Sequence, residues 1–301
     1  MLLVAGSANL DFVVRAPHIP APGETVLGRD FQTFPGGKGA NQAVACARAG
    51  GAVTHMLLAL GDDAFAVPLE VSLRDAGVQM HLVRVADQAT GTAFICVSDD
   101  AENAITVAPG ANLALRAEHL PPLEGYSHLL MQLEIPLATV LAYARAANAQ
   151  GVKVVLNAAP AQPLPDELLA LVDVLIVNQG ELAVVSGHQG SVAECLARIE
   201  VPSVVVTLGR HGCCARTEAG FLTQPAFDVA AIDTTGAGDT FCGVLVAALA
   251  VSNDWVRALK MANAAGALAC TRLGAQSGIP VLAEVQAFYM TNQAAGPVQH
   301  A

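Results

Sequence analysis

Short and long apolar segments alternate along most of this chain. Short runs such as Val53–Leu60, Lys153–Leu156 and Ser203–Thr207 have the composition of buried strands. Longer stretches such as Leu137–Ala149 and Trp255–Thr271 repeat apolar residues at helical spacing. The same alternation predicts further strands and helices at Met1–Gly6, His128–Gln132, Val174–Val177, Val67–Ala76, Asp166–Leu171 and Thr240–Ala250. Continuously apolar strands that alternate with helices indicate an α/β fold whose parallel sheet is covered on both faces.

Two segments interrupt this alternation with strands of a more exposed kind. Phe12–Arg15 and Leu27–Phe34 have the pattern of partly exposed strands, and Thr92–Ser98 with Ala104–Ala108 indicates a hairpin. Ligands bind at the carboxyl edge of open parallel sheets. We therefore expect the insertions at about 11–34 and 92–108 to form a small β-sheet lid over that edge. The whole chain, 1–301, is expected to be one domain.

Composition narrows the class of protein. Hydrophobic residues make up 53% of the chain and charged residues 14%, which is typical of a globular protein. The longest apolar run, Val244–Val251, is well short of the roughly 20 residues that a membrane span needs. Met1–Gly6 contains no basic residue and is predicted to be a buried strand, not a signal peptide. We therefore expect a cytoplasmic protein that does not bind membranes.

The charge balance argues against nucleic acid as a partner. The net charge is −11, and the only lysines are Lys38, Lys153 and Lys260. The phosphates of a bound nucleotide would therefore be held by backbone amides, Mg²⁺ and a few arginines. Seven dispersed cysteines without a CxxC pair, and dispersed histidines, argue against a zinc site and favour free thiols.

Residues 233–241 form the first chemically informative motif, Asp-Thr-Thr-Gly-Ala-Gly-Asp-Thr-Phe. A strand-like run, Phe227–Ile232, precedes it and an apolar helix follows. Three small residues would let a ligand approach the anion-binding amides at the helix start: Gly236, Ala237 and Gly238. Asp239 would stand there as general base for a hydroxyl that attacks a phosphoryl group, or it could simply cap the helix. A dinucleotide fingerprint is excluded, because Phe241 occupies its third glycine position.

The second motif is the glycine cluster that opens a predicted helix at residues 35–45. It is not a Walker A loop, because Lys38 is followed by Gly39 and not by Ser or Thr. Lys38 and Asn41 offer polar groups that can bind hydroxyls. The alternative is that the glycines serve only close packing of the helix.

Together the two motifs resemble the two signatures of the ribokinase (PfkB) family of carbohydrate kinases. They lie in the expected order about 200 residues apart, and the resemblance extends from Leu3 to about Pro280. It implies a ribokinase-like three-layer sandwich with a mostly parallel central sheet and a small β-sheet lid. Residues 6–11, 131–134 and 157–161 also resemble the family's ribose-specific members.

The resemblance implies three groups of site residues. The sugar would contact Asn9, Asp11, Gly37, Lys38, Asn41, Glu134 and Asp239. ATP would contact Asn178, Glu181, Thr207, Gly209, Arg210, Gly212, Gly238 and Asn263. A potassium ion would be held, mostly through backbone carbonyl oxygens, by Asp233, Thr235, Ala269, Arg272, Gly274 and Gly278. Glu181 would help to organise Mg²⁺ through water. Judged without the family, Asp11 is equally a turn former, and Asn178, Glu181 and Asn263 are ordinary polar residues.

The implied activity is transfer of a phosphoryl group from MgATP to the primary 5-hydroxyl of D-ribose, giving ribose 5-phosphate. Asp239 would be the base, and the amides of residues 236–239 would hold the γ-phosphate. The alternatives are a kinase of deoxyribose, a ketose or a nucleoside, and a non-catalytic sugar-binding protein. Exposed apolar lid residues, namely Phe12, Val14 and Phe31, predict a homodimer formed through the lid.

Overall fold

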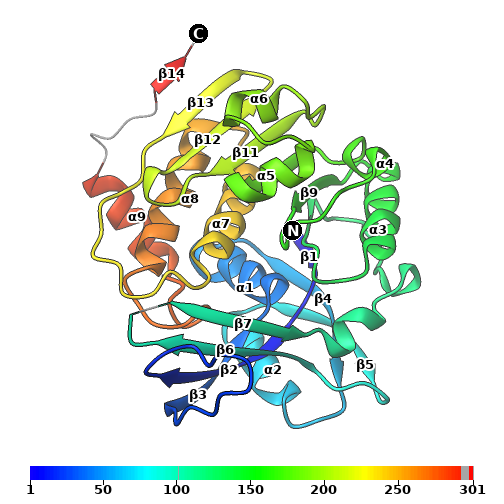
Figure 1. The fold of residues 1–301 in the computed structure, drawn as a ribbon. Coiled ribbons are helices and arrows are strands. Elements are labelled where there is room, and N and C mark those ends of the chain that lie inside the picture. The colour runs from blue at the N-terminus through cyan, green and yellow to red at the C-terminus, as the bar shows by residue number, and fades with distance from the viewer. Residues whose placement is uncertain (101, 293–297, 301) are drawn as a thin grey trace.

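The computed structural model describes residues 1–100, 102–292 and 298–300, and a ten-stranded sheet forms its centre (Figure 1). The strand order is β14-β13-β12-β11-β10-β9-β8-β1-β4-β5. The seven strands from β11 to β5 run parallel, and β12, β13 and β14 add an antiparallel edge. The strands span Leu2–Ala5 (β1), Thr54–Gly61 (β4), Gln79–Val85 (β5), His128–Met131 (β8), Lys153–Asn157 (β9), Val174–Asn178 (β10), Ser203–Thr207 (β11), Cys213–Thr217 (β12), Gly220–Gln224 (β13) and Val298–His300 (β14).

Helices cover both faces of this sheet. They span Lys38–Val44 (α1), Ala66–Asp75 (α2), Leu137–Ala149 (α3), Asp166–Leu169 (α4), Gln179–Ser186 (α5), Val192–Leu196 (α6), Ala237–Val251 (α7), Trp255–Ala269 (α8) and Leu282–Thr291 (α9). A π-helical turn, Ala45–Ala49, continues α1, and short 3₁₀ turns lie at Gly110–Ala114, Ala117–His119 and Gly209–His211.

The sheet separates two hydrophobic cores. Leu2 and Val4 of β1 face the core built with α1, α2, α7, α8 and α9, whereas Leu3 and Ala5 face the core built with α3 to α6. Successive side chains of a strand point to opposite faces, so a strand buried on both sides must be apolar throughout. This arrangement confirms the predicted three-layer α/β sandwich.

A second sheet of four strands forms the predicted lid (Figure 1). Its strands are Asn9–Ala16 (β2), Arg29–Gly36 (β3), Gly91–Ser98 (β6) and Asn103–Ala108 (β7), in the order β3-β2-β6-β7. The two insertions meet where β2 pairs in parallel with β6 from Asn9↔Gly91 onward. All six side chains of β7 are exposed, and they point alternately to the two faces, so the main body covers neither face of the lid at this edge strand.

One predicted strand is wrong, and one part of the sheet was not predicted. Phe227–Ile232 forms no strand; instead the backbone N–H groups of Ile232 and Asp233 both donate to the carbonyl oxygen of Cys270 at the end of α8. The antiparallel edge formed by β12, β13 and β14 was missed. Within the described residues, no helix combines the length and apolar character needed to cross a membrane.

Candidate active site

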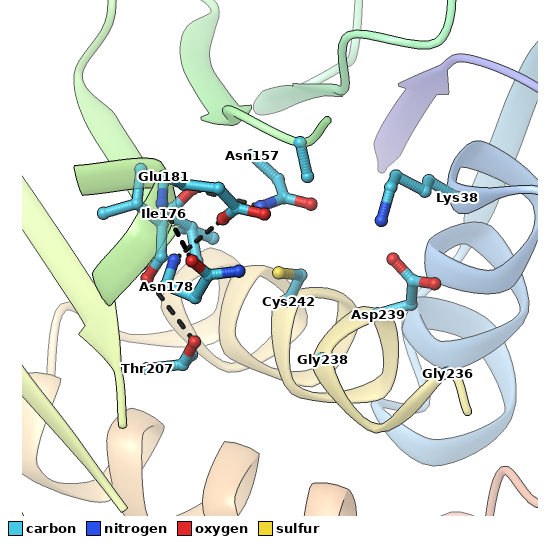
Figure 2. A pocket seen from close by; sticks show the side chains of 12 residues that line it. Lys38, Asn157, Ile176, Asn178, Glu181, Thr207, Gly236, Gly238, Asp239 and Cys242 are labelled. Atoms are coloured by element: carbon cyan, nitrogen blue, oxygen red, sulfur yellow. Dashed lines mark hydrogen bonds between the residues drawn. The ribbon is translucent and has the colours of Figure 1, made fainter. Parts of the chain in front are cut away.

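The carboxyl ends of three neighbouring strands supply one wall of a polar cavity of about 170 Å³ (Figure 2). Asn157, Asn178 and Thr207 are the last residues of β9, β10 and β11, and all three line it. Parallel strands end at a common edge, so residues far apart in sequence meet there. Lys38 and Asp239 lie on the opposite side, on α1 and α7.

Asp239 is held by two amide donors from α1. Its Oδ2 accepts from Nδ2 of Asn41 at 2.9 Å, and its Oδ1 accepts from Nε2 of Gln42 at 2.9 Å. The capping position of α7 is Gly236, with φ +74°, and Asp239 is the third residue of the helix. The view that Asp239 merely caps the helix is therefore wrong. Its carboxylate lines the cavity beside Gly238.

The start of α7 requires glycine at position 236. A Cβ atom there would lie 2.9 Å from Cα of Ala275, and its positive φ is itself unfavourable for other residues. Gly236 and Gly238 both line the cavity. The first amides of a helix have no intrahelical partner, and the helix dipole makes this end attractive to anions. This end of the helix suits a phosphate group.

Lys38 provides the cationic side chain of the cavity. The charge of Asp239 is the main cause that raises the pKa of the Lys38 ammonium above its usual value; burial opposes this shift, and Glu134 and Glu181 reinforce it. Figure 2 shows the amine and the Asp239 carboxylate facing each other. A charged lysine here suits an anionic ligand such as a phosphate group.

The predicted sugar-binding acids lie beside Asp239. Burial, with the charges of Glu134 and Asp239, raises the pKa of Asp11 from 3.8 to about 7. Glu134 accepts hydrogen bonds from the hydroxyl of Ser7 and from the backbone N–H of Lys38. Asp11, Glu134 and Asp239 therefore lie close enough for their charges to interact, and their oxygens can accept from the hydroxyl groups of a sugar.

Asn9 and Asn41 are buried at 2% and 5% exposure. The Oδ1 of Asn9 accepts from Nδ2 of Asn112, which also donates to the carbonyl of Ala8. Within the described residues, Oδ1 of Asn41 is buried and has no hydrogen-bond partner. An orphaned acceptor at the edge of this acid cluster is costly unless a ligand satisfies it.

A larger cavity of about 630 Å³ adjoins the first. The two cavities share Asn178, Thr207 and Gly238. Of the eight predicted nucleotide residues, seven line the larger cavity: Asn178, Thr207, Gly209, Arg210, Gly212, Gly238 and Asn263. The segment that was wrongly predicted as a strand also lines it, through Phe227, Asp228, Val229 and Ala231. A mixed polar and apolar cavity of this size suits an adenine nucleotide.

The eighth residue, Glu181, lies in the smaller cavity and also caps α5. Its Oε2 accepts from the backbone N–H of Asn178 at 2.8 Å, and Oδ1 of Asn178 accepts from the N–H of Glu181 at 2.9 Å. Burial is the main cause that raises the pKa of Glu181 above its usual value. The carboxylate thus has both a structural role in the helix cap and a position in the cavity that Lys38 and Asp239 also line.

The loop before α7 is tied to the loop after α8. Oδ1 of Asp233 accepts from the N–H of Thr235 at 2.9 Å, and Oδ2 accepts from the N–H of Gly274 at 2.8 Å. The bond to Gly274 spans 41 residues. Asp233 therefore ties the loop before α7 to the loop after α8; these two loops carry five of the six predicted cation ligands, and the sixth, Ala269, is the last residue of α8.

Carbonyl oxygens from three of these ligands converge beside Gly278. A Cβ atom there would lie 2.7, 3.2 and 3.6 Å from the carbonyl oxygens of Gly274, Ala269 and Arg272. The side chain of Arg272 points elsewhere, because its guanidinium forms two hydrogen bonds with Glu284. Only its carbonyl oxygen is placed to hold an ion.

Sequence reasoning missed four buried polar side chains of this site: Gln42, Asn112, Gln132 and Asn157. Gln42 is the residue after Asn41, and it stands in a helix whose other buried residues are Gly39, Ala40, Asn41, Ala43 and Val44. A large amide side chain among such small residues could have indicated that Gln42 belongs to the site, because a buried amide needs hydrogen-bond partners.

The fold and the two adjoining cavities describe a phosphotransferase that takes a small polyhydroxylated substrate. A model of the pfkB family carbohydrate kinases matches residues 1–282. The chain therefore belongs to the pfkB family of carbohydrate kinases, as its two motifs predicted.

Individual relatives are more specific. The ribokinase of Haemophilus influenzae is 38% identical over 299 residues, which cover 95% of this chain and 97% of that protein. The ribokinase of Bacillus subtilis is 37% identical and covers 95% and 98%. Among solved structures, the ribokinase of Thermotoga maritima has a TM-score of 0.89 at 35% identity and covers 97% and 99%. The ribokinase of Arabidopsis thaliana, complexed with ribose and ATP, has a TM-score of 0.88 at 31% identity and covers 96% and 98%.

Proposed function

We propose that this protein transfers the γ-phosphoryl group of ATP to the 5-hydroxyl of D-ribose, giving ribose 5-phosphate and ADP. One observation carries the proposal. Asp239 lies at the first turn of α7, in the small cavity that also holds Lys38, and Gly238 beside it belongs to the adjoining larger cavity as well. A base for the sugar hydroxyl and an anion site for the phosphate thus occupy one turn of helix. The ribokinase relatives support ribose as the sugar.

The Asp239 carboxylate would accept the proton of the 5-hydroxyl while that oxygen attacks the γ-phosphorus. The bond between the γ-phosphorus and the bridging oxygen then breaks, and ADP leaves with the electron pair. Amides of residues 236–239 and the Lys38 ammonium would stabilise the charge on the transferred group. Placing both reactants at one helix start supplies much of the rate enhancement.

The remaining ribose hydroxyls would be bound by the acid and amide groups beside the lid. Asp11 and Glu134 offer acceptors, and the orphaned Oδ1 of Asn41 offers another. We propose that the lid closes over the sugar, which would exclude water and so limit wasteful hydrolysis of ATP.

The donor set also fits the two cations of the proposed reaction. Mg²⁺ bound by the ATP phosphates would be approached by Glu181 through water, and it would neutralise phosphate charge. Potassium would be held by the carbonyl oxygens that converge beside Gly278, with Asp233 nearby. The donors named for both ions are oxygen atoms, which suit such hard ions. Replacing K⁺ by tetramethylammonium should lower both turnover and Tm; equal Tm in the two salts would speak against the site.

The substrate is tested by measuring ADP release with MgATP and K⁺ over a panel of ribose, deoxyribose, fructose, adenosine and pseudouridine. We expect kcat/KM for ribose to exceed that of every other compound, and NMR of the product to place the phosphate on the 5-oxygen. A larger kcat/KM for another member of the panel would replace ribose as the substrate and leave the fold and family unchanged.

We further propose that the lid pairs with the lid of a second copy. Phe12 stacks with Phe31 and Phe94, at ring-centroid distances of 6.1 and 5.3 Å. Phe31 and Phe94 are 63% and 54% exposed, so a second lid would bury apolar surface. Light scattering should give twice 30.8 kDa for the protein and a smaller mass for Phe31→Ser. A monomeric mass for the unsubstituted chain would exclude the dimer.

A further inference from the structure

A chain of buried amides ends on the Asp239 carboxylate. Nε2 of Gln42 donates to Oδ1 of Asp239 and to Oδ1 of Asn157, both at 2.9 Å. Oε1 of Gln42 accepts from Nε2 of Gln132 at 2.6 Å, and Nδ2 of Asn157 donates to the carbonyl of Ile176 at 3.1 Å. These hydrogen-bonded amide side chains thus join α1 and α7 to the carboxyl ends of three parallel strands, β8, β9 and β10.

The orientation of Gln42 follows from the chemistry of its neighbours. A carboxylate only accepts hydrogen bonds, so the NH₂ group of Gln42 must face Asp239, and its carbonyl oxygen must face Gln132. Both N–H groups and the carbonyl oxygen of Gln42 then have partners. A side chain with every polar group satisfied is fixed in one rotamer, because any rotation leaves a buried group unpaired.

Packing holds this donor in place. Gln42 is 0% exposed and lines neither cavity, so no substrate reaches it. Helices α1 and α7 approach closely at Gly243, where a Cβ atom would lie 2.6 Å from the backbone carbonyl oxygen of Gln42. This close helix contact keeps the backbone of Gln42 near α7, the helix that carries Asp239.

We propose that Gln42 is a positioning residue for the reaction: it fixes the rotation of the Asp239 carboxylate so that one oxygen faces the attacking hydroxyl. This rests on the proposed function, in which Asp239 is the base. The Asn41 amide holds Oδ2, and a single bond to one oxygen leaves the carboxylate free to turn about that contact. The second bond, from Gln42 to Oδ1, removes this freedom. Turnover then depends on Gln42, whereas binding of the substrates does not.

The test compares Gln42→Met, which keeps length and volume but has no N–H donor, with the unsubstituted chain. We expect kcat to fall roughly 10- to 100-fold because the base is misplaced in most complexes. KM for ATP, and the ribose Kd from calorimetry without ATP, should stay within about twofold, because Gln42 touches neither cavity. Gln42→Glu has the same shape but turns an acceptor toward Asp239, and its kcat should be at least as low.

Two further variants separate positioning from loss of stability. Thr217→Val removes a buried hydroxyl on β12, where it donates to the carbonyl of Gly220 far from the site. It should lower Tm without changing kcat. Gln132→Met removes only the donor to Oε1 of Gln42, so it should reduce kcat by a smaller factor, and it serves if Gln42→Met does not fold.

The outcomes are distinguishable. If the unsubstituted chain does not phosphorylate ribose, the proposed function fails and the positioning role must be tested with whichever substrate is accepted. If ribose is phosphorylated but Gln42→Met keeps its kcat, or loses ribose affinity as much as kcat, Gln42 is a structural residue and the inference is wrong.

Discussion

The sugar side and the nucleotide side of the active site differ in the kinds of residue that line them. On the sugar side, buried polar side chains converge: the charges of Glu134 and Asp239 act on both Asp11 and Lys38, and two side-chain amides hold Asp239. On the nucleotide side, a cavity of about 630 Å³ is lined largely by glycine, alanine and apolar residues, with Arg210 at an exposed position. The sugar side offers side-chain hydrogen-bond partners in fixed positions, and the nucleotide side offers a shaped cavity and backbone groups.

This difference matches what each ligand needs. A sugar is distinguished from other sugars by the directions of its hydroxyls, which only oriented donors and acceptors can read. A nucleotide can be held by a helix start and a shaped cavity, so a chain with a net charge of −11 needs few cations there. Changes on the sugar side should therefore alter chemistry and stability, and changes on the nucleotide side should alter ATP affinity.

The largest expected effect is that of Asp239→Asn. The amide keeps the shape of the side chain but cannot take the hydroxyl proton, so kcat should fall about 10²- to 10⁴-fold. Ribose affinity should change little, because other groups also bind the sugar. Single-turnover ADP formation measures the first effect and calorimetry the second. If kcat survives the substitution, Asp239 is not the base.

A smaller effect is expected from Gly212→Ala on the nucleotide side. A Cβ atom at Gly212 would lie 2.1 Å from the carbonyl oxygen of Gln224, and φ is +91°. Backbone lining the larger cavity must shift, so KM for ATP should rise about tenfold, roughly 1.4 kcal/mol, while ribose Kd stays constant.

Gly209→Ala is the matched control for this change. It also has positive φ, +56°, and lines the same cavity, but a Cβ atom there meets nothing within 4 Å. Its KM for ATP should rise less. Equal effects of the two substitutions would mean that backbone strain, and not crowding of the cavity wall, sets ATP affinity.

Most of the fold could be predicted from local pattern. Ser203–Thr207 coincides with β11, because strands of a doubly covered sheet are continuously apolar, and Leu137–Ala149 coincides with α3, because its apolar residues recur at helical spacing. Phe227–Ile232 is also mostly apolar, but the N–H of Ile232 donates to the carbonyl oxygen of Cys270, just after α8, and no local pattern contains such a distant contact. The lid insertions were predictable because their strands are only partly buried and so interrupt the continuously apolar pattern of the main sheet.

The site could be predicted only as far as its motifs reach. Asp239 and Lys38 stand at helix starts marked by glycines, and the structure brings them to one cavity. The role of Gln42 depends on partners 90 and 197 residues away, Gln132 and Asp239, so the sequence around it contains no sign of them. The potassium ligands were predicted from the family resemblance alone. The convergence of carbonyl oxygens beside Gly278 is visible only in three dimensions.

The last prediction concerns stability and not kinetics, namely what the ionised carboxylate of Asp11 on the sugar side costs the fold. Burial raises its pKa from 3.8 to about 7, so between these values the folded protein keeps a proton that the unfolded chain releases. Stability therefore falls as pH rises through this window. Asp11→Asn removes that loss, and its gain in Tm should be greater at pH 8 than at pH 5, by about 5 °C.

Asp63→Asn gives the opposite sign and serves as the control. Burial raises the pKa of Asp63, but hydrogen bonds from Thr90, Ala66 and Phe65 outweigh it and lower the pKa below its usual value. Its carboxylate therefore stabilises the fold above the ordinary carboxyl pKa, and this contribution is lost as the pH falls. Asp63→Asn should lower Tm at pH 8, whereas Asp11→Asn should raise it and weaken ribose binding. Thermal melts at pH 5 and pH 8 test both signs: the ionised carboxylate of Asp11 should destabilise the folded protein, and that of Asp63 should stabilise it.

If Asp11→Asn instead lowers Tm at pH 8, the Asp11 carboxylate stabilises the fold, and the two sides of the site differ less than the structure indicates.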